Sequence, residues 1–174
     1  MKLVVETGAG LPDANSYVSL NDAMKNLPSL AKEEWKGMLK NERIDRLVIA
    51  SQFIDVSFIW AGQQKTFEQG LSWPRVCVYF EGHSVPDNIV PRQVKRAVIM
   101  ALLMIFEHGI SVFQSNAELL VKKEKLGPIE TEYFSPGVHY YEFKSQYEDI
   151  NNMLHGFYSA PSGGNVIAVD VKRI

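Results

Sequence analysis

The hydrophobic pattern of the chain is strongest from Ile89 to Ile110, where apolar residues recur every three or four positions. Most of the circumference is apolar, so the pattern predicts a helix that is enclosed on nearly all sides. Pro91 suits its first turn and Gly109 suits a C-terminal cap. The unbroken apolar run from Ala97 to Phe106 is too short for a membrane span, which needs ~20 residues. We therefore expect a central helix covered by its own domain and by a neighbouring subunit.

Three further helices are predicted before this one. Ser19, with Asp22 three residues later, has the pattern of an N-terminal cap. Ser29 starts a second short helix, and Asn41 is predicted to cap a third, longer one. The third is amphipathic and should pack on the central helix through residues at helical spacing: Ile44, Leu47, Val48, Phe53 and Ile54. Before these helices, Lys2 to Glu6 is expected to form a brief strand followed by a loop.

The helical period fails between residues 58 and 88. So long an irregular segment is uncommon in a compact domain unless it is functional or packed by its own aromatic residues. We expect Leu71, Trp73 and Tyr79 to supply that packing, with the tryptophans as core residues beneath the loop. The alternative for the tryptophans is contact with a partner, because Trp is enriched at interfaces. Cys77 is expected to be a buried thiol.

After residue 110 the pattern becomes charged and alternating. Val121 to Phe134 predicts a hairpin with lysines on one arm and glutamates on the other, which would attract each other across the strands. A last helix is predicted from Ser145 to Tyr158. The end of the chain, Asn165 to Ile174, is apolar and β-prone, so it is expected to be an extended arm that adds to another chain.

These elements predict a mainly α fold: a small helical bundle around one long apolar helix, with an added β-hairpin and an extended C-terminal arm. The predicted divisions are residues 1–18 (strand and loop), 19–110 (helical core with the irregular loop 58–88), 111–143 (hairpin element) and 144–174 (C-terminal helix and arm).

Composition excludes several classes of function. The 174 residues carry a net charge of −2, so there is no global attraction to nucleic acid or anionic membrane. The single Cys77 excludes an internal disulfide and a cysteine-rich metal site. The first residues lack the apolar core of a signal peptide, which predicts a cytosolic product. Common hydrolase and metalloprotease motifs are absent, and the histidines lack metal-ligand spacing. We expect no catalytic residues, no metal and no cofactor.

Two local features could still bind an anion. Gly8-Ala9-Gly10 invites comparison with a phosphate loop, although an ordinary turn is the simpler interpretation. The second feature is a group of cations, Arg92, Lys95 and Arg96, at the start of the central helix, where they oppose the helix dipole. They could be solvated or paired with Glu81 or Asp87. Otherwise they meet an acidic partner surface or a phosphate.

Several fragments resemble one protein family. They are VVETGAGLPDANSYVSL (Val4–Leu20), LSWPR (Leu71–Arg75), VPDNIVPRQVKRA (Val85–Ala97) and VKKEKLGPIETEY (Val121–Tyr133). They resemble tailed-phage proteins labelled DnaT-like single-stranded-DNA-binding proteins, which are also similar in helix order to head–tail connector (adaptor) proteins. The resemblance covers about residues 4–134, and the Asn-Ser-Tyr and Trp-Pro-Arg pieces are its most specific parts.

The resemblance implies a structural virion protein. Such adaptors form an oligomeric ring, usually a dodecamer, that binds the portal protein and a tail or nozzle protein. Double-stranded DNA passes through the ring without sequence recognition during genome packaging and ejection. The expected location is the neck of the virion, after assembly in the host cytoplasm, with no membrane contact.

Single-stranded-DNA binding, which the family label implies, is the alternative. It needs a basic groove with aromatic residues for stacking, and the lysines of the hairpin and the cations of the central helix are the only candidates. The residues expected to contact partners are Arg92, Lys95, Arg96, Lys122, Lys123, Lys125, Val166, Ile167, Val169, Val171 and Ile174.

Overall fold

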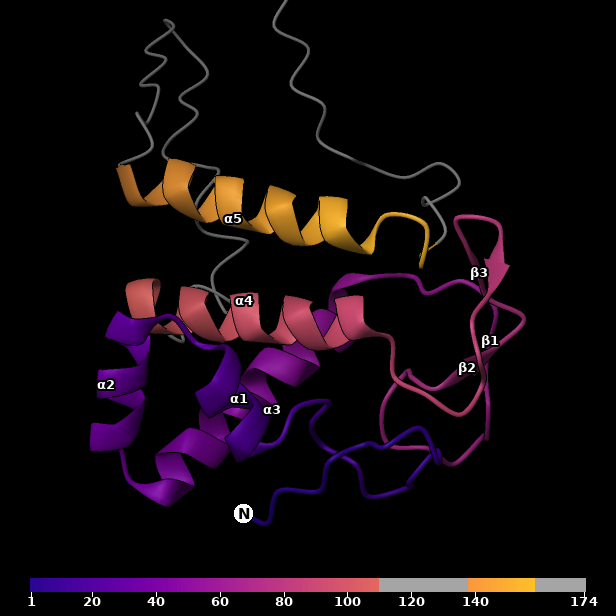
Figure 1. Ribbon diagram of the computed structural model, residues 1–174, viewed down its shortest axis with the longest axis horizontal. Coiled ribbons are helices and arrows are strands. Elements are labelled where there is room, and N and C mark those ends of the chain that lie inside the picture. Colours follow the sequence, from indigo (N-terminus) through magenta and orange to yellow (C-terminus); the bar gives the residue numbers. More distant parts are fainter. Residues whose placement is uncertain (110–137, 159–174) are drawn as a thin grey trace, which may run out of the picture.

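The computed structural model describes residues 1–109 and 138–158, with side chains from residue 145 onward in the second range. Within these residues there are five helices and two small antiparallel ribbons (Figure 1). The helices are α1 (Leu20–Asn26), α2 (Ser29–Gly37), α3 (Lys40–Ser57), α4 (Arg92–His108) and α5 (Val138–Leu154). The ribbons pair β1 (Gln63–Gln64) with β2 (Arg75–Val76), and β3 (Tyr79–Phe80) with β4 (His83–Ser84).

The central helix is α4, which lies between α3 and α5 (Figure 1). Pro91 precedes it and Gly109 ends it at a φ of 79°, as the sequence predicts. At the far end from Pro91, Trp35 of α2 packs edge-on against Phe106, with ring centroids 6.2 Å apart. The apolar face is buried inside one chain at Val94, Ala97, Val98, Ile99, Ala101, Leu102, Met104 and Ile105. These side chains need no neighbouring subunit to cover them, contrary to our expectation, because α5 closes the side that α3 leaves open.

The starts of the helices agree with the sequence in part. The Ser19 hydroxyl accepts the Asp22 N–H at 3.0 Å, so the predicted cap is confirmed. α3 begins two residues earlier than predicted, because its N-cap is Leu39 rather than Asn41. The Glu42 carboxylate accepts the Leu39 N–H at 3.1 Å, and Asn41 lies inside the helix. α5 begins at Val138 rather than at Ser145, so residues 138–143 are helical and not part of a hairpin.

The N-terminal segment forms no strand. Val5 makes an isolated bridge to Ser16, where the Glu6 N–H donates to the Ser16 carbonyl and the Asn15 N–H donates to the Val4 carbonyl, both at 2.9 Å. The side chain of Asn15 adds two further hydrogen bonds. Its Oδ1 accepts the Val4 N–H at 2.8 Å, and its Nδ2 donates to the Lys2 carbonyl at 2.9 Å. The segment is thus held by backbone pairing with residues 15 and 16 and by the Asn15 side chain, although the paired stretch is too short to form a strand.

The irregular loop from 58 to 88 is packed by its own aromatic residues. Trp60 and Trp73 are buried and pack edge-on, with ring centroids 5.7 Å apart, so their interpretation as core residues is confirmed. Tyr79 was expected to join them, but it is 67% exposed. Its neighbour Phe80 packs beneath the loop instead, because adjacent strand residues point to opposite faces. The Phe80 ring stacks on Phe157 with ring centroids 4.2 Å apart. Cys77 is exposed rather than buried.

The last helix carries the predicted apolar face. Ile150 and Leu154 are fully buried, and Phe157 follows in the turn after α5. The predicted hairpin and C-terminal arm lie outside the described residues, as do the partner-contact residues Lys122, Lys123, Lys125, Val166, Ile167, Val169, Val171 and Ile174. None of the helices in residues 1–109 and 138–158 combines the length and hydropathy needed to cross a bilayer.

Candidate functional site

Three cations stand together at the start of α4. Arg92, Lys95 and Arg96 are exposed, because the opposite face of the same turns carries the buried Val94 and Ala97. Of the predicted partner residues, these three lie in the described part of the chain, and the helix brings them together.

The cations make no ion pair with any described residue. In the described part of the chain, ion pairs join Lys36 to Glu33 and His108 to Glu107, and none of them involves a cation of α4. The pairing with Glu81 or Asp87 that the sequence allowed is therefore not formed.

This arrangement costs free energy in the isolated protein. The first turn of α4 has no acidic residue, and each cation there opposes the helix dipole by about 0.3–1 kcal/mol. Arg92 and Arg96 are also four residues apart, a spacing at which like charges repel by roughly 0.2–0.5 kcal/mol. An anion bound at this end of the helix would relieve both costs.

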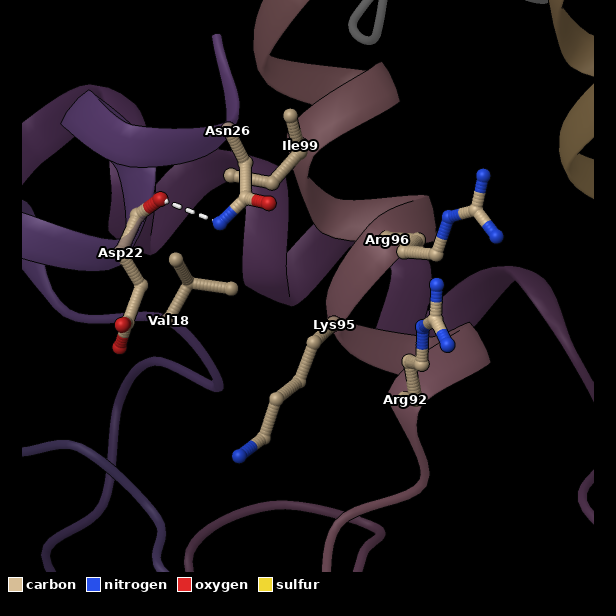
Figure 2. Close-up of a pocket in the computed structure, with 7 residues that line it drawn as sticks. All are labelled: Val18, Asp22, Asn26, Arg92, Lys95, Arg96 and Ile99. Atoms are coloured by element: carbon tan, nitrogen blue, oxygen red, sulfur yellow. Dashed lines mark hydrogen bonds between the residues drawn. The ribbon is translucent and has the colours of Figure 1, made fainter.

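The cations border a pocket of about 370 Å³ between α1 and α4. Figure 2 shows Lys95 reaching into the space between the two helices, while the guanidinium groups of Arg92 and Arg96 lie beside each other on the far side of α4. The remaining lining residues are Val18, Asp22, Asn26 and Ile99.

The α1 side of the pocket is held in place by hydrogen bonds. Asn26 Nδ2 donates to the Asp22 carbonyl at 2.8 Å, which leaves the Asn26 amide oxygen facing α4 (Figure 2). The Asp22 carboxylate accepts the Ser19 hydroxyl at 2.6 Å through one of its oxygens. The pocket is thus lined by the first turns of α4, by Asp22 and Asn26 of α1, and by the apolar Val18 and Ile99, while the guanidinium groups point away from α1 (Figure 2).

The glycine turn near the N-terminus binds an anion from its own chain. Glu6 is fully buried, and its carboxylate accepts N–H groups of Gly8 at 2.7 Å, Gly10 at 3.0 Å and Leu11 at 2.7 Å. The donors that a phosphate would need are already occupied, so the phosphate-loop alternative is wrong and this is a structural turn. Gly8 is required there, since a Cβ would lie 1.9 Å from the Asn88 carbonyl oxygen.

A second buried carboxylate ties the irregular loop to α3. Asp55 accepts hydrogen bonds from the Tyr17 hydroxyl, from the Ser72 N–H at 2.9 Å and from the Ser72 hydroxyl at 3.2 Å. Burial raises the pKa of Asp55, while these donors and the charge of Arg75 oppose the rise. Burial and the neighbouring Asp55 raise the pKa of Tyr17 well above its ordinary value. Because its acceptors are satisfied within the chain, we assign Asp55 a structural role.

Metal binding finds no support in the described part of the chain, where no group of three His, Cys, Asp or Glu side chains converges. The sequence identified the three cations but missed Val18, Asn26 and Ile99. No local signal marks these residues, since they become pocket residues only when α1 packs beside α4.

Comparison with models of protein families gives a match over the whole chain. The family model described as "Putative DnaT-like ssDNA binding protein" matches residues 1–174. No curated protein and no solved structure matches the chain. The family description agrees with single-stranded-DNA binding, the alternative drawn from the sequence, better than with a head–tail adaptor.

Proposed function

Since the chain belongs to the DnaT-like ssDNA-binding protein family, we propose that it binds single-stranded DNA through the start of α4. The observation that carries this proposal is the group of cations, Arg92, Lys95 and Arg96, which border a pocket and form no ion pair with the residues that the structure describes. Phosphates are the anions best suited to such a group, and they provide most of the affinity of sequence-independent DNA binding.

The geometry also limits the strength of binding. Strong single-strand binders stack successive bases on aromatic side chains. No aromatic residue lines the pocket beside the cations, and the exposed Phe67 and Tyr79 belong to the irregular loop. With a net charge of −2, the protein has no long-range attraction to compensate. We therefore expect modest affinity that is dominated by phosphate contacts and strongest at low salt.

The test is the salt dependence of binding to a labelled single strand, measured by fluorescence anisotropy. Neutralising three phosphates of a single strand predicts a slope of log K against log salt of about −2. Combined replacement of Arg92, Lys95 and Arg96 by Glu should abolish binding. The matched control reverses as many charges elsewhere, at Lys32, Lys36 and Lys40 on α2 and α3, and should leave the slope unchanged. Absence of salt-sensitive binding by the unmodified protein would refute the proposal.

A head–tail adaptor ring is the second candidate. It is supported by the sequence resemblance and by exposed apolar side chains at the end of α3, where Val56 is 80% and Ile59 65% exposed. Val56 also borders a groove of about 530 Å³ formed with the loop. In this proposal copies of the chain form a ring in the virion neck between portal and tail, and the α4 cations face double-stranded DNA in the channel.

The two candidates differ in assembly. The adaptor requires a defined oligomer, or an oligomer formed on the portal protein, which native mass measurement would detect. A chain that stays monomeric with and without portal would contradict the adaptor and leave single-strand binding untouched. Both candidates involve binding alone, so we propose that the protein has no catalytic activity and needs no cofactor.

A further inference from the structure

We propose that a base of the bound strand stacks on the ring of Phe67, so that the loop between β1 and β2 is a second part of the DNA site. This inference rests on the proposed binding of single-stranded DNA, and it adds a contact that the cations of α4 do not supply. Three features support it: the exposure of the ring, the hydrogen bonds that fix its loop, and the position of that loop beside the segment that leads into α4.

Phe67 is the most exposed large apolar side chain in the described part of the chain, at 98%. Its ring therefore contributes nothing to the core. The backbone around it is nevertheless fixed by the buried side chain of Gln69, whose Oε1 accepts the Thr66 N–H at 3.0 Å. The Nε2 of the same side chain donates to the carbonyls of Leu71 at 2.7 Å and Pro74 at 3.1 Å. A ring presented on a fixed turn loses little conformational entropy when a ligand packs on it.

The Phe67 loop lies beside the segment that leads into α4. The Lys65 ammonium donates to the Gly8 carbonyl at 3.3 Å, which holds the loop against the glycine turn. That turn touches the segment before α4, because a Cβ at Gly8 would lie 1.9 Å from the Asn88 carbonyl oxygen. From Asn88 to Arg92 the chain spans at most about 14 Å. Figure 1 shows the β1–β2 ribbon beyond the end of α4 at which the helix begins. One strand of the four or more nucleotides that such sites cover can therefore reach both parts.

The loop suits a base better than a phosphate. Beside the ring, the exposed carboxylate of Glu68 repels phosphate and offsets the charge of the nearby Lys65. The α4 group, in contrast, carries three positive charges and forms no ion pair with the residues that the structure describes. Phosphates would thus bind at α4 and a base at Phe67. Because every base has a π face, stacking there needs no particular sequence.

Tyr79 is the other strongly exposed aromatic residue of the irregular loop, at 67%. It lies on the β3–β4 ribbon, which packs on the turn after α5 through the stacked rings of Phe80 and Phe157. Figure 1 shows β3 beside the end of α5. Tyr79 therefore belongs to a different part of the surface, and it is the matched control for Phe67.

Fluorescence anisotropy with labelled oligo(dT) and with an abasic strand of equal length tests the inference on the full-length protein. Phe67→Ala should weaken binding of oligo(dT) by about fivefold or more, the contribution of one stacked base. Binding of the abasic strand and the slope against salt should stay unchanged, since the phosphate contacts remain. Phe67→Trp should restore the affinity. Tyr79→Ala should bind both strands as the unmodified protein does.

The fold should tolerate these changes, because a side chain that is almost fully exposed has few packing contacts to lose. Urea unfolding of Phe67→Ala checks this.

The outcomes separate this inference from the proposed function. Undiminished binding of oligo(dT) by Phe67→Ala would overturn the stacking contact and leave phosphate binding at α4 standing. A lower native mass of that variant would then assign the ring to contact between copies instead. An equal loss on the abasic strand, or an equal loss in Tyr79→Ala, would overturn it too. Failure of both strands to bind the unmodified protein would overturn the proposed function and the inference with it.

Discussion

At the scale of single residues, the buried charged groups differ from the surface cations of α4 in whether the chain itself supplies hydrogen-bond partners. The carboxylates of Glu6 and Asp55 accept hydrogen bonds from donors of their own chain. The guanidinium of Arg75 is likewise satisfied by carbonyls, among them Ala61 at 2.6 Å and Gly62 at 2.9 Å. The cations of α4 have no such partners in the described residues. This contrast is the main reason to assign them a function rather than a structural role.

Asp55→Ala should strongly destabilise the fold. The change leaves the buried Tyr17 hydroxyl and the Ser72 N–H without their acceptor, at a cost of about 2–4 kcal/mol together. Urea unfolding followed by tryptophan fluorescence measures the loss. Asp45→Ala, an exposed carboxylate on the same helix, is the control and should change stability little. Equal losses in the two variants would show that the Asp55 network contributes nothing specific.

The same carboxylate predicts a pH dependence. Burial raises the pKa of Asp55 above its ordinary value, so the folded state holds this proton more tightly than the unfolded state. Its contribution to the free energy of unfolding then falls as pH rises from the unfolded pKa, about 3.9, through the folded pKa. Asp55→Asn removes this term, so the stability difference, native minus variant, should decrease across that range. An increase with pH would mean that the hydrogen bonds outweigh burial.

At the scale of elements, the sequence predicts the helices whose ends and apolar period are set by neighbouring residues. α4 could be placed because Pro91, Gly109 and the apolar period agree. The two ribbons could not, since strands of two residues are too short for an alternating pattern and depend on pairing between distant segments. The pocket was half predicted: its cations follow from the helix itself, but Asn26 and Val18 belong to it through the packing of α1 beside α4.

Charge reversal at the start of α4 should affect stability and binding in opposite directions. Arg92→Glu places an acidic residue in the first turn, where the helix dipole favours it, so it should raise the free energy of unfolding by about 0.3–1 kcal/mol at low salt. Arg96→Glu, one turn further on, replaces a like-charge pair with Arg92 by an opposite-charge pair and should raise it by roughly 0.2–0.5 kcal/mol. Both should weaken binding of single-stranded DNA. Unfolding and fluorescence-anisotropy measurements on the same preparations test whether stability rises while DNA affinity falls. A loss of stability in both variants would indicate that the arginines hold the fold together.

At the scale of the whole molecule, the core is complete within the residues that the structure describes. Phe157 packs on Phe80 and meets Trp73 edge-on at 5.7 Å. Its carbonyl accepts the Ala61 N–H at 2.9 Å, and Tyr158 bridges to Trp60. The turn after α5 thus closes the aromatic cluster under the loop. Assembly with other copies is not needed to bury this core, so any partner must be bound by surface groups.

This closure predicts how the chain tolerates shortening at its C-terminus. A chain that ends at Tyr158 keeps every buried residue of the aromatic cluster, so its free energy of unfolding should match that of the full chain within about 0.5 kcal/mol. A chain that ends at Leu154 loses Phe157, and the cavity should cost about 3–5 kcal/mol. Thermal unfolding and native mass, measured on both and on the full chain, test this. Early unfolding of the Tyr158 form would show that the last residues complete the core. Reduced mass with unchanged stability would instead favour the adaptor, because the removed residues would then act between copies.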